Sequence, residues 1–202
     1  MSRQAGNQRK NTERKLIIAS LLAASAASAF AAVDTYTIDP THTYPSFEAD
    51  HMGISLWRGK FQKTSGSVTL DRTAKTGSID IHIDPSTIDF GMDKMNERAL
   101  APDLFDVKQF PNITYKSTSI NFDGDTPVSV DGELTLRGVT KPVKLTINSF
   151  KCIQHPMLKR EVCGADATAE FKRTDFGVSY GVPKMFAPEV KLAIQVEAVK
   201  TN

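Results

Sequence analysis

Hydrophobic and polar residues alternate one by one along much of the chain after residue 31. The segment 79–84 reads Ile-Asp-Ile-His-Ile-Asp, and the same period of two recurs at 67–71, 128–136, 143–148 and 189–198. Such alternation is typical of strands that bury one face, whereas parallel strands covered on both faces carry continuous hydrophobic runs. The pattern therefore predicts antiparallel strands. The hydrophobic residues expected on their buried faces are Val68, Leu70, Ile79, Ile81, Ile83, Val128, Val130, Leu134, Leu136, Val143, Leu145, Ile147, Val190, Leu192, Ile194, Val196 and Ala198.

Turn-forming residues separate these segments. We read Thr64-Ser65-Gly66, Lys75-Thr76-Gly77, Asp123-Gly124-Asp125 and Arg137-Gly138 as turns. About eight strands of this length account for the chain. Because each strand has one wet face, the sheet must either close on itself or fold onto a second sheet. The alternation is compatible with both a barrel and a sandwich and does not choose between them.

One short segment, from about residue 92 to residue 100, reads as a helix. Met92, Met95 and Ala99 recur there at i, i+3 and i+7, and Pro102 follows closely. Proline cannot continue a helix, so its position indicates where this one ends.

The first predicted strands place unusual residues together. Phe47 and His51 share one face of their strand, and Trp57 and Phe61 share one face of the next. Aromatic residues often fill an ordinary core, and a histidine there is usually hydrogen-bonded. An eight-stranded barrel, however, is also wide enough to leave room for one small ligand. Both readings stay open here. His82 falls on the polar face, where we expect it to be solvated.

Charge is distributed unevenly. Residues 1–31 carry five basic residues and one acidic residue, which leaves 20 basic and 22 acidic residues in 32–202. A nucleic-acid-binding protein is expected to have a basic face or stripe, and the main part of the chain shows none.

The basic N-terminal segment has the features of a cleaved export signal. A short hydrophobic run at 16–22 follows it, then a tract of alanine and serine. Ala29 and Ala31 flank Phe30 in an A-x-A pattern, which predicts cleavage before Ala32, with cleavage after Ala29 as the second choice. A permanent membrane anchor is the alternative, but it needs about 20 hydrophobic residues. We therefore expect residues 1–31 to be removed and 32–202 to form a single domain.

The chain has two cysteines, Cys152 and Cys163. An exported protein meets an oxidising compartment, which favours a disulfide between them. Two alternatives exist. His155 lies between the cysteines and suggests a zinc site, although a structural zinc needs four ligands. A redox pair would more typically be spaced C-x-x-C.

No catalytic motif stands out. Asp175-Phe176-Gly177 matches a kinase triplet, but neither a glycine-rich phosphate loop nor an H-R-D sequence accompanies it. G-x-S-x-G and H-E-x-x-H are also absent. Most carboxylates fall on the outward side of the alternation, so nothing in the sequence argues positively for chemistry.

Four blocks of sequence, in order, resemble a known family. They are Phe47-x-Ala49-x-His51 with Trp57-Arg58-Gly59-Lys60-Phe61, then 104–117, 132–143 and 173–177. From about Tyr36 to Val199 the chain resembles the YceI-like family of exported lipid-binding proteins. The resemblance implies an antiparallel lipocalin-like β-barrel, which favours the barrel over the sandwich.

The resemblance also implies a function. We expect a periplasmic protein that sequesters or carries a polyisoprenoid or similar long-chain lipid, quinone-like or polyprenyl, without cofactor, metal or catalysis. Transient membrane contact and a dimer are further expectations. Two alternatives are a secreted hydrolase or isoprenoid-modifying enzyme, with His51 and a carboxylate as acid and base, and a ligand-free structural or stress-response module. The expected ligand-binding residues are Phe47, His51, Trp57, Phe61, Phe105 and Phe176. The cysteine hairpin is expected at the rim of the barrel.

Overall fold

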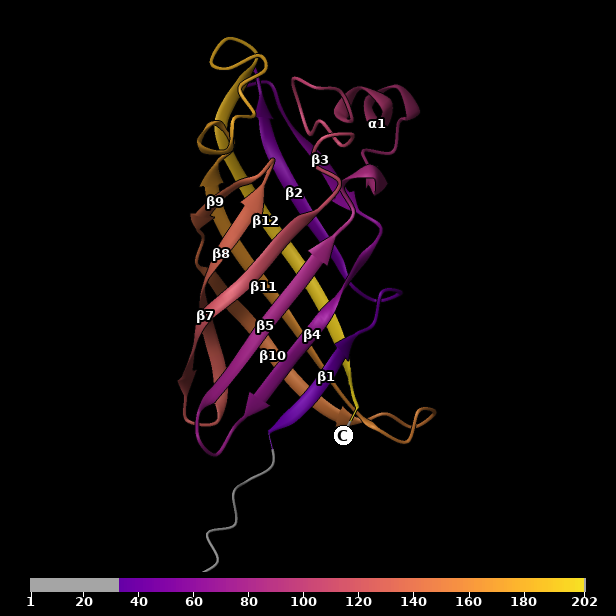
Figure 1. The fold of residues 1–202 in the computed structure, drawn as a ribbon, viewed down its shortest axis with the longest axis vertical. Coiled ribbons are helices and arrows are strands. Elements are labelled where there is room, and N and C mark those ends of the chain that lie inside the picture. Colours follow the sequence, from indigo (N-terminus) through magenta and orange to yellow (C-terminus); the bar gives the residue numbers. More distant parts are fainter. Residues whose placement is uncertain (1–32, 202) are drawn as a thin grey trace, which may run out of the picture. The chain divides into compact units, whose positions relative to one another are not determined.

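Eight antiparallel strands close into a barrel in the computed structural model, which describes residues 33–201 (Figure 1). The closed order is β1-β4-β5-β7-β8-β10-β11-β12, and β12 pairs with β1 to complete the ring. The predicted lipocalin-like barrel is therefore confirmed. The strands are β1 (Asp34–Ile38), β2 (Tyr44–His51), β3 (Ser55–Phe61), β4 (Thr64–Asp71), β5 (Thr76–Ile83), β6 (Ile88–Asp89), β7 (Ile113–Asp123), β8 (Thr126–Leu136), β9 (Val139–Pro142), β10 (Leu145–Gln154), β11 (Glu161–Lys172) and β12 (Phe186–Lys200). The predicted leader and its cleavage site lie outside the described residues.

The longest strand, β12, connects two parts of the wall. Near its C-terminal end it pairs with β1, and along the rest of its length the same edge pairs with β2. The wall then continues from β2 to β3 and from β3 to the short β6. The hairpin of β2 and β3 therefore extends the wall toward the end of the barrel at which α1 lies (Figure 1).

Between residues 33 and 201, three short helical segments accompany the strands: the 3-10 helices η1 (Pro85–Thr87) and η2 (Arg173–Phe176) and the α-helix α1 (Asp93–Ala99). α1 lies within the predicted range of 92–100, so this prediction is confirmed. Across the described residues, no helix combines the length and the hydrophobicity needed to cross a membrane.

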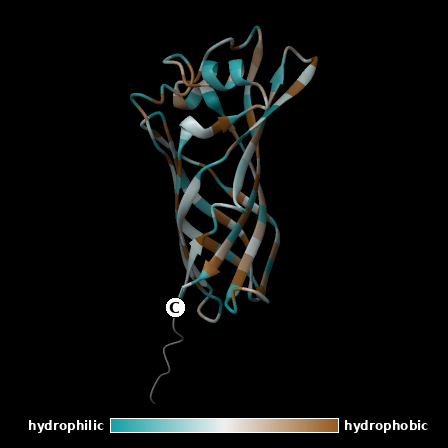
Figure 2. Ribbon diagram, turned by 90° about the vertical axis from the view of Figure 1, so that its right-hand side faces the viewer, coloured by the Kyte–Doolittle hydropathy of each residue, from teal (hydrophilic) through white to brown (hydrophobic). Residues whose placement is uncertain are grey.

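Alternation along the strands produces a hydrophobic interior and a polar exterior. Figure 2 shows hydrophobic and hydrophilic positions following one another along the ribbon. All the residues expected on the buried faces lie in the core or line the interior, with the exception of Val128. That side chain is 37% exposed, and its neighbour Pro127 is buried instead. The pairing of β7 with β8 shifts register between Asn121 and Phe122, and such an irregularity exchanges the two faces of a strand.

The Thr64-Ser65-Gly66 segment is not a turn, which corrects the reading of the sequence. These residues begin β4, where Ser65 pairs with His82, and the chain turns earlier, at Gln62 and Lys63. Gly66 is needed for a different reason. Its φ of +143° is a conformation that side chains rarely adopt, and a Cβ there would lie 2.1 Å from the carbonyl oxygen of Asp80.

Side chains fill the end of the barrel opposite α1. They come from β1, β4, β7, β11 and β12, and the fully buried ones are Tyr36, Leu70, Ile120, Cys163 and Ala198. The Tyr36 hydroxyl donates a hydrogen bond to Glu161, and Arg72 donates to the same carboxylate. Burial and the Glu161 charge raise the pKa of the Tyr36 hydroxyl. This end is a packed core, so any ligand must lie nearer α1.

Candidate ligand-binding cavity

A cavity of about 450 Å³ runs inside the barrel from the α1 end to the middle. Aliphatic side chains form its walls because the inward positions of the strands converge there. They are Ile38, Val68, Ile79, Ile81, Ile83, Val130, Leu134, Leu145, Ile147, Leu192, Ile194 and Val196. Tyr180 and Met185, which also line the cavity, are exposed, so the cavity reaches the surface at the α1 end. Volumes of this size are usual for sites that hold a small molecule.

A cluster of four phenylalanines forms one side of the cavity. Phe47 lies 5.7 Å from Phe61 and 5.6 Å from Phe90 between ring centroids, and Phe61 lies 5.7 Å from Phe105. These separations and tilted or edge-on geometries are favourable for aromatic pairs. Gly59 makes room for the cluster, since a Cβ there would lie 2.6 Å from the Phe47 ring.

His51 and Trp57 form a second aromatic group with Phe186. The His51 ring lies 4.6 Å from Trp57 and 5.1 Å from Phe186, centroid to centroid. Trp57 and Phe186 meet edge to face at 5.6 Å. The group forms because His51 ends β2 and pairs there with Phe186, the first residue of β12. It therefore lies at the turn between β2 and β3.

The structure places five of the six expected ligand-binding residues in the cavity wall: Phe47, His51, Trp57, Phe61 and Phe105. Phe176 is not among the lining residues. It is 1% exposed and packs edge-on against Phe171, with centroids 5.2 Å apart. Because η2 turns the chain after β11, Phe171 faces the cavity and Phe176 supports it from behind.

Sequence reasoning missed Phe171 and Phe186 as lining residues. Phe171 continues the inward alternation of Ala165, Ala167 and Ala169 along β11, and that pattern could have identified it. Phe186 follows an irregular segment, and only its pairing with His51 places it at the cavity.

Polar groups in the cavity wall are few, and most have partners inside the protein. The Tyr115 hydroxyl donates to the Val143 carbonyl at 2.9 Å, and burial raises its pKa. Thr43 donates to the Glu197 carbonyl, whereas the buried Thr64 hydroxyl has no partner. Arg98 pairs with Asp103 through two hydrogen bonds of 2.7 and 2.6 Å. Within the described residues, no aspartate or glutamate lines the cavity, so His51 has no carboxylate there to complete an acid–base pair.

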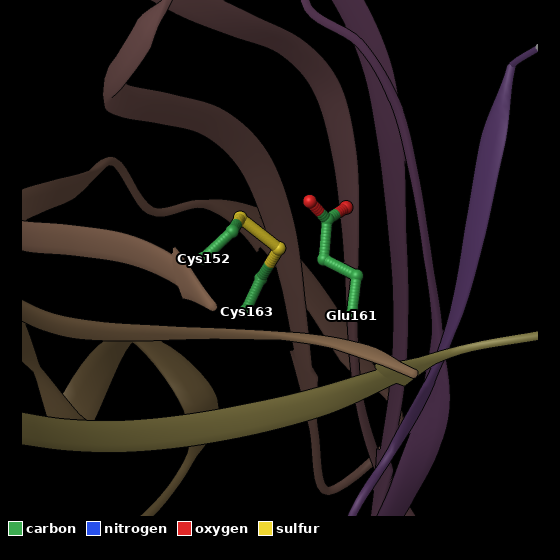
Figure 3. Close-up of side chains that lie close together, drawn as sticks. All are labelled: Cys152, Glu161 and Cys163. Carbon is green, nitrogen blue, oxygen red and sulfur yellow. A yellow bond between two sulfur atoms is a disulfide. The ribbon is translucent and has the colours of Figure 1, made fainter. Parts of the chain in front are cut away.

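The two cysteines form a disulfide between β10 and β11, where they are directly paired (Figure 3). The Glu161 carboxylate lies beside it, and these three residues are close enough to be considered as metal ligands. Zinc binds thiolates, however, and both sulfurs are used by the disulfide. His155 is not part of the group, and its Nδ1 accepts a hydrogen bond from the Leu158 amide. The hairpin lies at the end of the barrel opposite α1 (Figure 1).

Removing the disulfide should lower stability and leave ligand retention unchanged. Replacing Cys152 and Cys163 together by alanine should reduce the free energy of unfolding by roughly 2–3 kcal/mol, because the bond closes a short loop in the unfolded chain. Neither cysteine lines the cavity. Urea unfolding measures the stability and lipid extraction measures retention. Two free thiols in the denatured, unreduced wild-type protein would contradict the disulfide.

Comparison with known proteins gives a consistent result. Residues 36–198 match the family model of the YceI-like domain. Protein YceI of Escherichia coli is 31% identical over 179 residues, which cover 87% of this chain and 91% of that protein. Protein YceI of Salmonella arizonae is 29% identical over 168 residues, which cover 82% of this chain and 86% of that protein.

Solved structures show the same fold. BcnA of Burkholderia cenocepacia superimposes with a TM-score of 0.64 at 26% identity, over 79% of this chain and 98% of BcnA. A polyisoprenoid-binding domain from Saccharophagus degradans, described as implicated in plant cell wall breakdown, gives a TM-score of 0.62 at 17% identity, over 82% and 98% of the two chains. The barrel, its cavity and these sequence matches agree, and the chain belongs to the YceI-like family.

Proposed function

We propose that this protein sequesters or carries a long-chain isoprenoid lipid in its barrel cavity. The observation that supports the proposal is the cavity itself, which is enclosed by strands and lined almost entirely by aliphatic and aromatic side chains. A long hydrocarbon chain gains about 0.8 kcal/mol for each CH₂ removed from water, and it needs no hydrogen bonds from the wall. The Saccharophagus degradans domain, which has the same fold, is described as binding polyisoprenoids.

In this proposal the lipid tail contacts the two aromatic groups. Phe47, Phe61 and Phe105 would border it on one side, and His51 and Trp57 near the α1 end. Phe176 would act indirectly, by holding Phe171 in the wall.

We further propose that the protein is exported to the periplasm after cleavage before Ala32. The disulfide supports this location, because such bonds persist in oxidising compartments. Mass spectrometry of the protein from a periplasmic extract should show an N-terminus at Ala32.

Lipid exchange would bring the open end of the barrel to a membrane. The turn between β2 and β3 exposes Met52 and Ile54, and Leu56 is exposed at the start of β3. The Met52 amide donates a hydrogen bond to the carbonyl of the exposed Met185. Apolar side chains around the opening could enter the lipid surface. The expected dimer stays a prediction, which light scattering on the purified protein would check.

Filling the cavity should test the function directly. Ala167 lies on the inward face of β11 and lines the cavity, so Ala167→Trp should occupy the space of the lipid. Organic extraction followed by mass spectrometry should find an isoprenoid in about stoichiometric amount in the wild type, and much less in the variant. Glu170→Trp, an exposed position on the same strand, is the control and should retain the lipid.

The same extraction distinguishes the other functions. A wild-type protein that neither carries nor takes up any isoprenoid would point to the ligand-free module. An added isoprenoid recovered in chemically altered form would point to an enzyme, although no cavity-lining carboxylate in the described part of the chain supports that reading.

A further inference from the structure

Arg173 is a buried arginine in the cavity wall. It begins η2, directly after β11, and is 8% exposed. Its Nη2 donates to the Tyr180 carbonyl at 2.8 Å and its Nε to the Ala187 carbonyl at 3.5 Å. The guanidinium carbon lies 5.3 Å from the centroid of the Phe186 ring. The side chain is thus held at the α1 end of the cavity, next to the His51 and Trp57 group.

This guanidinium has no acidic partner among the described residues. Arg58, Arg72 and Arg98 each pair with a carboxylate, whereas the hydrogen bonds of the Arg173 guanidinium go to two carbonyl groups. Burial lowers its pKa, but an arginine keeps its charge in proteins. A buried charge without a counter-ion is costly, and an anionic ligand beside it would offset that cost.

The two carbonyl contacts leave part of the guanidinium unused. An arginine has five N–H donors, and neither hydrogen of Nη1 has a partner in the described structure. Nη1 is not completely buried either, so accessible space lies beside it. A fork of free N–H groups fits the oxygens of a phosphate or carboxylate well.

The charge of the cavity points in the same direction. Its only formally charged lining residues in the described chain are Arg98 and Arg173, and Asp103 neutralises Arg98. His51 shares the Phe186 ring with Arg173, and its own ring nitrogens make no hydrogen bond to described residues. The α1 end of the cavity therefore combines one uncompensated positive charge with unused hydrogen-bonding groups, while most of the remaining wall is apolar.

We propose that Arg173 binds an anionic head group of the lipid, through phosphate or carboxylate oxygens, while the tail extends among the aliphatic strands. This inference rests on the proposed isoprenoid-binding function and adds the polarity and position of the head group. A cationic head group would be repelled, and a neutral one would leave the charge of Arg173 uncompensated.

Three probes with the same C20 tail test the proposal: geranylgeranyl diphosphate, geranylgeranoic acid and the neutral alcohol geranylgeraniol. Trp57, the single tryptophan, lies in the cavity wall, so its fluorescence reports binding. The wild type should bind at least one anionic probe about tenfold or more tightly than the alcohol, as expected for a charge-assisted hydrogen bond. The stronger of the two anionic probes identifies phosphate or carboxylate as the head group.

Arg173→Gln should remove this preference and leave the affinity for geranylgeraniol unchanged. Arg58→Gln, an exposed arginine on the outer face of β3, is the matched control and should retain the preference. If Arg173→Gln does not fold, the wild-type comparison of the three probes still decides. Equal wild-type affinities, or a preference that survives Arg173→Gln, would overturn the inference and leave the lipid-binding function intact. Failure of the wild type to bind any of the three probes would overturn both.

Discussion

Phe61→Asp should yield a protein without lipid. Phe61 is buried in the cavity wall between Phe47 and Phe105, so a carboxylate there would lie against the hydrocarbon tail. Removing a charge from water without a partner costs several kcal/mol, unless the group becomes protonated or recruits water. A protonated or hydrated carboxyl group is still polar, and the wall around the hydrocarbon tail must be apolar. Extraction and mass spectrometry of the purified variant should find no isoprenoid, and added isoprenoid should leave the Trp57 fluorescence unchanged.

Two controls separate lost binding from lost folding. Phe61→Ala would cost roughly 3–5 kcal/mol in a solid core, but less beside an existing cavity. We expect it to stay folded and to bind lipid more weakly. Lys60→Ala changes an exposed residue on the opposite face of β3 and should retain the lipid. If Phe61→Ala unfolds, or if it binds lipid like the wild type, the Phe61 side of the cavity does not contact the ligand.

Gly66→Ala should be among the most destabilising single-methyl changes in the barrel. A Cβ at this position would lie 2.1 Å from the Asp80 carbonyl oxygen and 3.0 Å from the Ile81 Cα, both backbone atoms of the paired strand β5. A rotamer change cannot relieve that contact, so β4 and β5 would have to separate locally. With the unfavourable φ of +143°, we expect a loss of roughly 3 kcal/mol or more in the free energy of unfolding.

Gly53→Ala is the matched control. Gly53 also has a positive φ, +70°, but no atom lies within 4 Å of the Cβ that the change would add. Only the conformational penalty applies, which is about 1 kcal/mol. Urea unfolding of both variants measures the difference. Similar stabilities would show that the backbone contact at Gly66 relaxes easily.

The sequence predicted the inward faces well, because a strand's period of two is a local property. Phe47 and Phe61 could be placed in the interior in this way. Closure of the sheet could not be read from alternation, since it depends on pairings between strands far apart in the chain, such as β1 with β12. The resemblance to a family supplied that choice.

The errors have a common physical origin in neighbours that are distant in sequence. Gly66 looked like a turn residue, but the opposite strand determines its role. Val128 points outward because the pairing of β7 with β8 shifts register. Distant neighbours also hid a feature that the sequence did not indicate, since the lack of an acidic partner for Arg173 is visible only in the folded chain.

The pairing of β12 with both β1 and β2 also determines when the protein can fold. Synthesis begins at the N-terminus, so the first two strands emerge long before the strand that holds both of them in the ring. Contacts between such distant segments form slowly. Until β12 has been made, the sheet has unpaired edge strands and its hydrophobic face is not enclosed. The ring can therefore close only after the last strand of the chain has been synthesised.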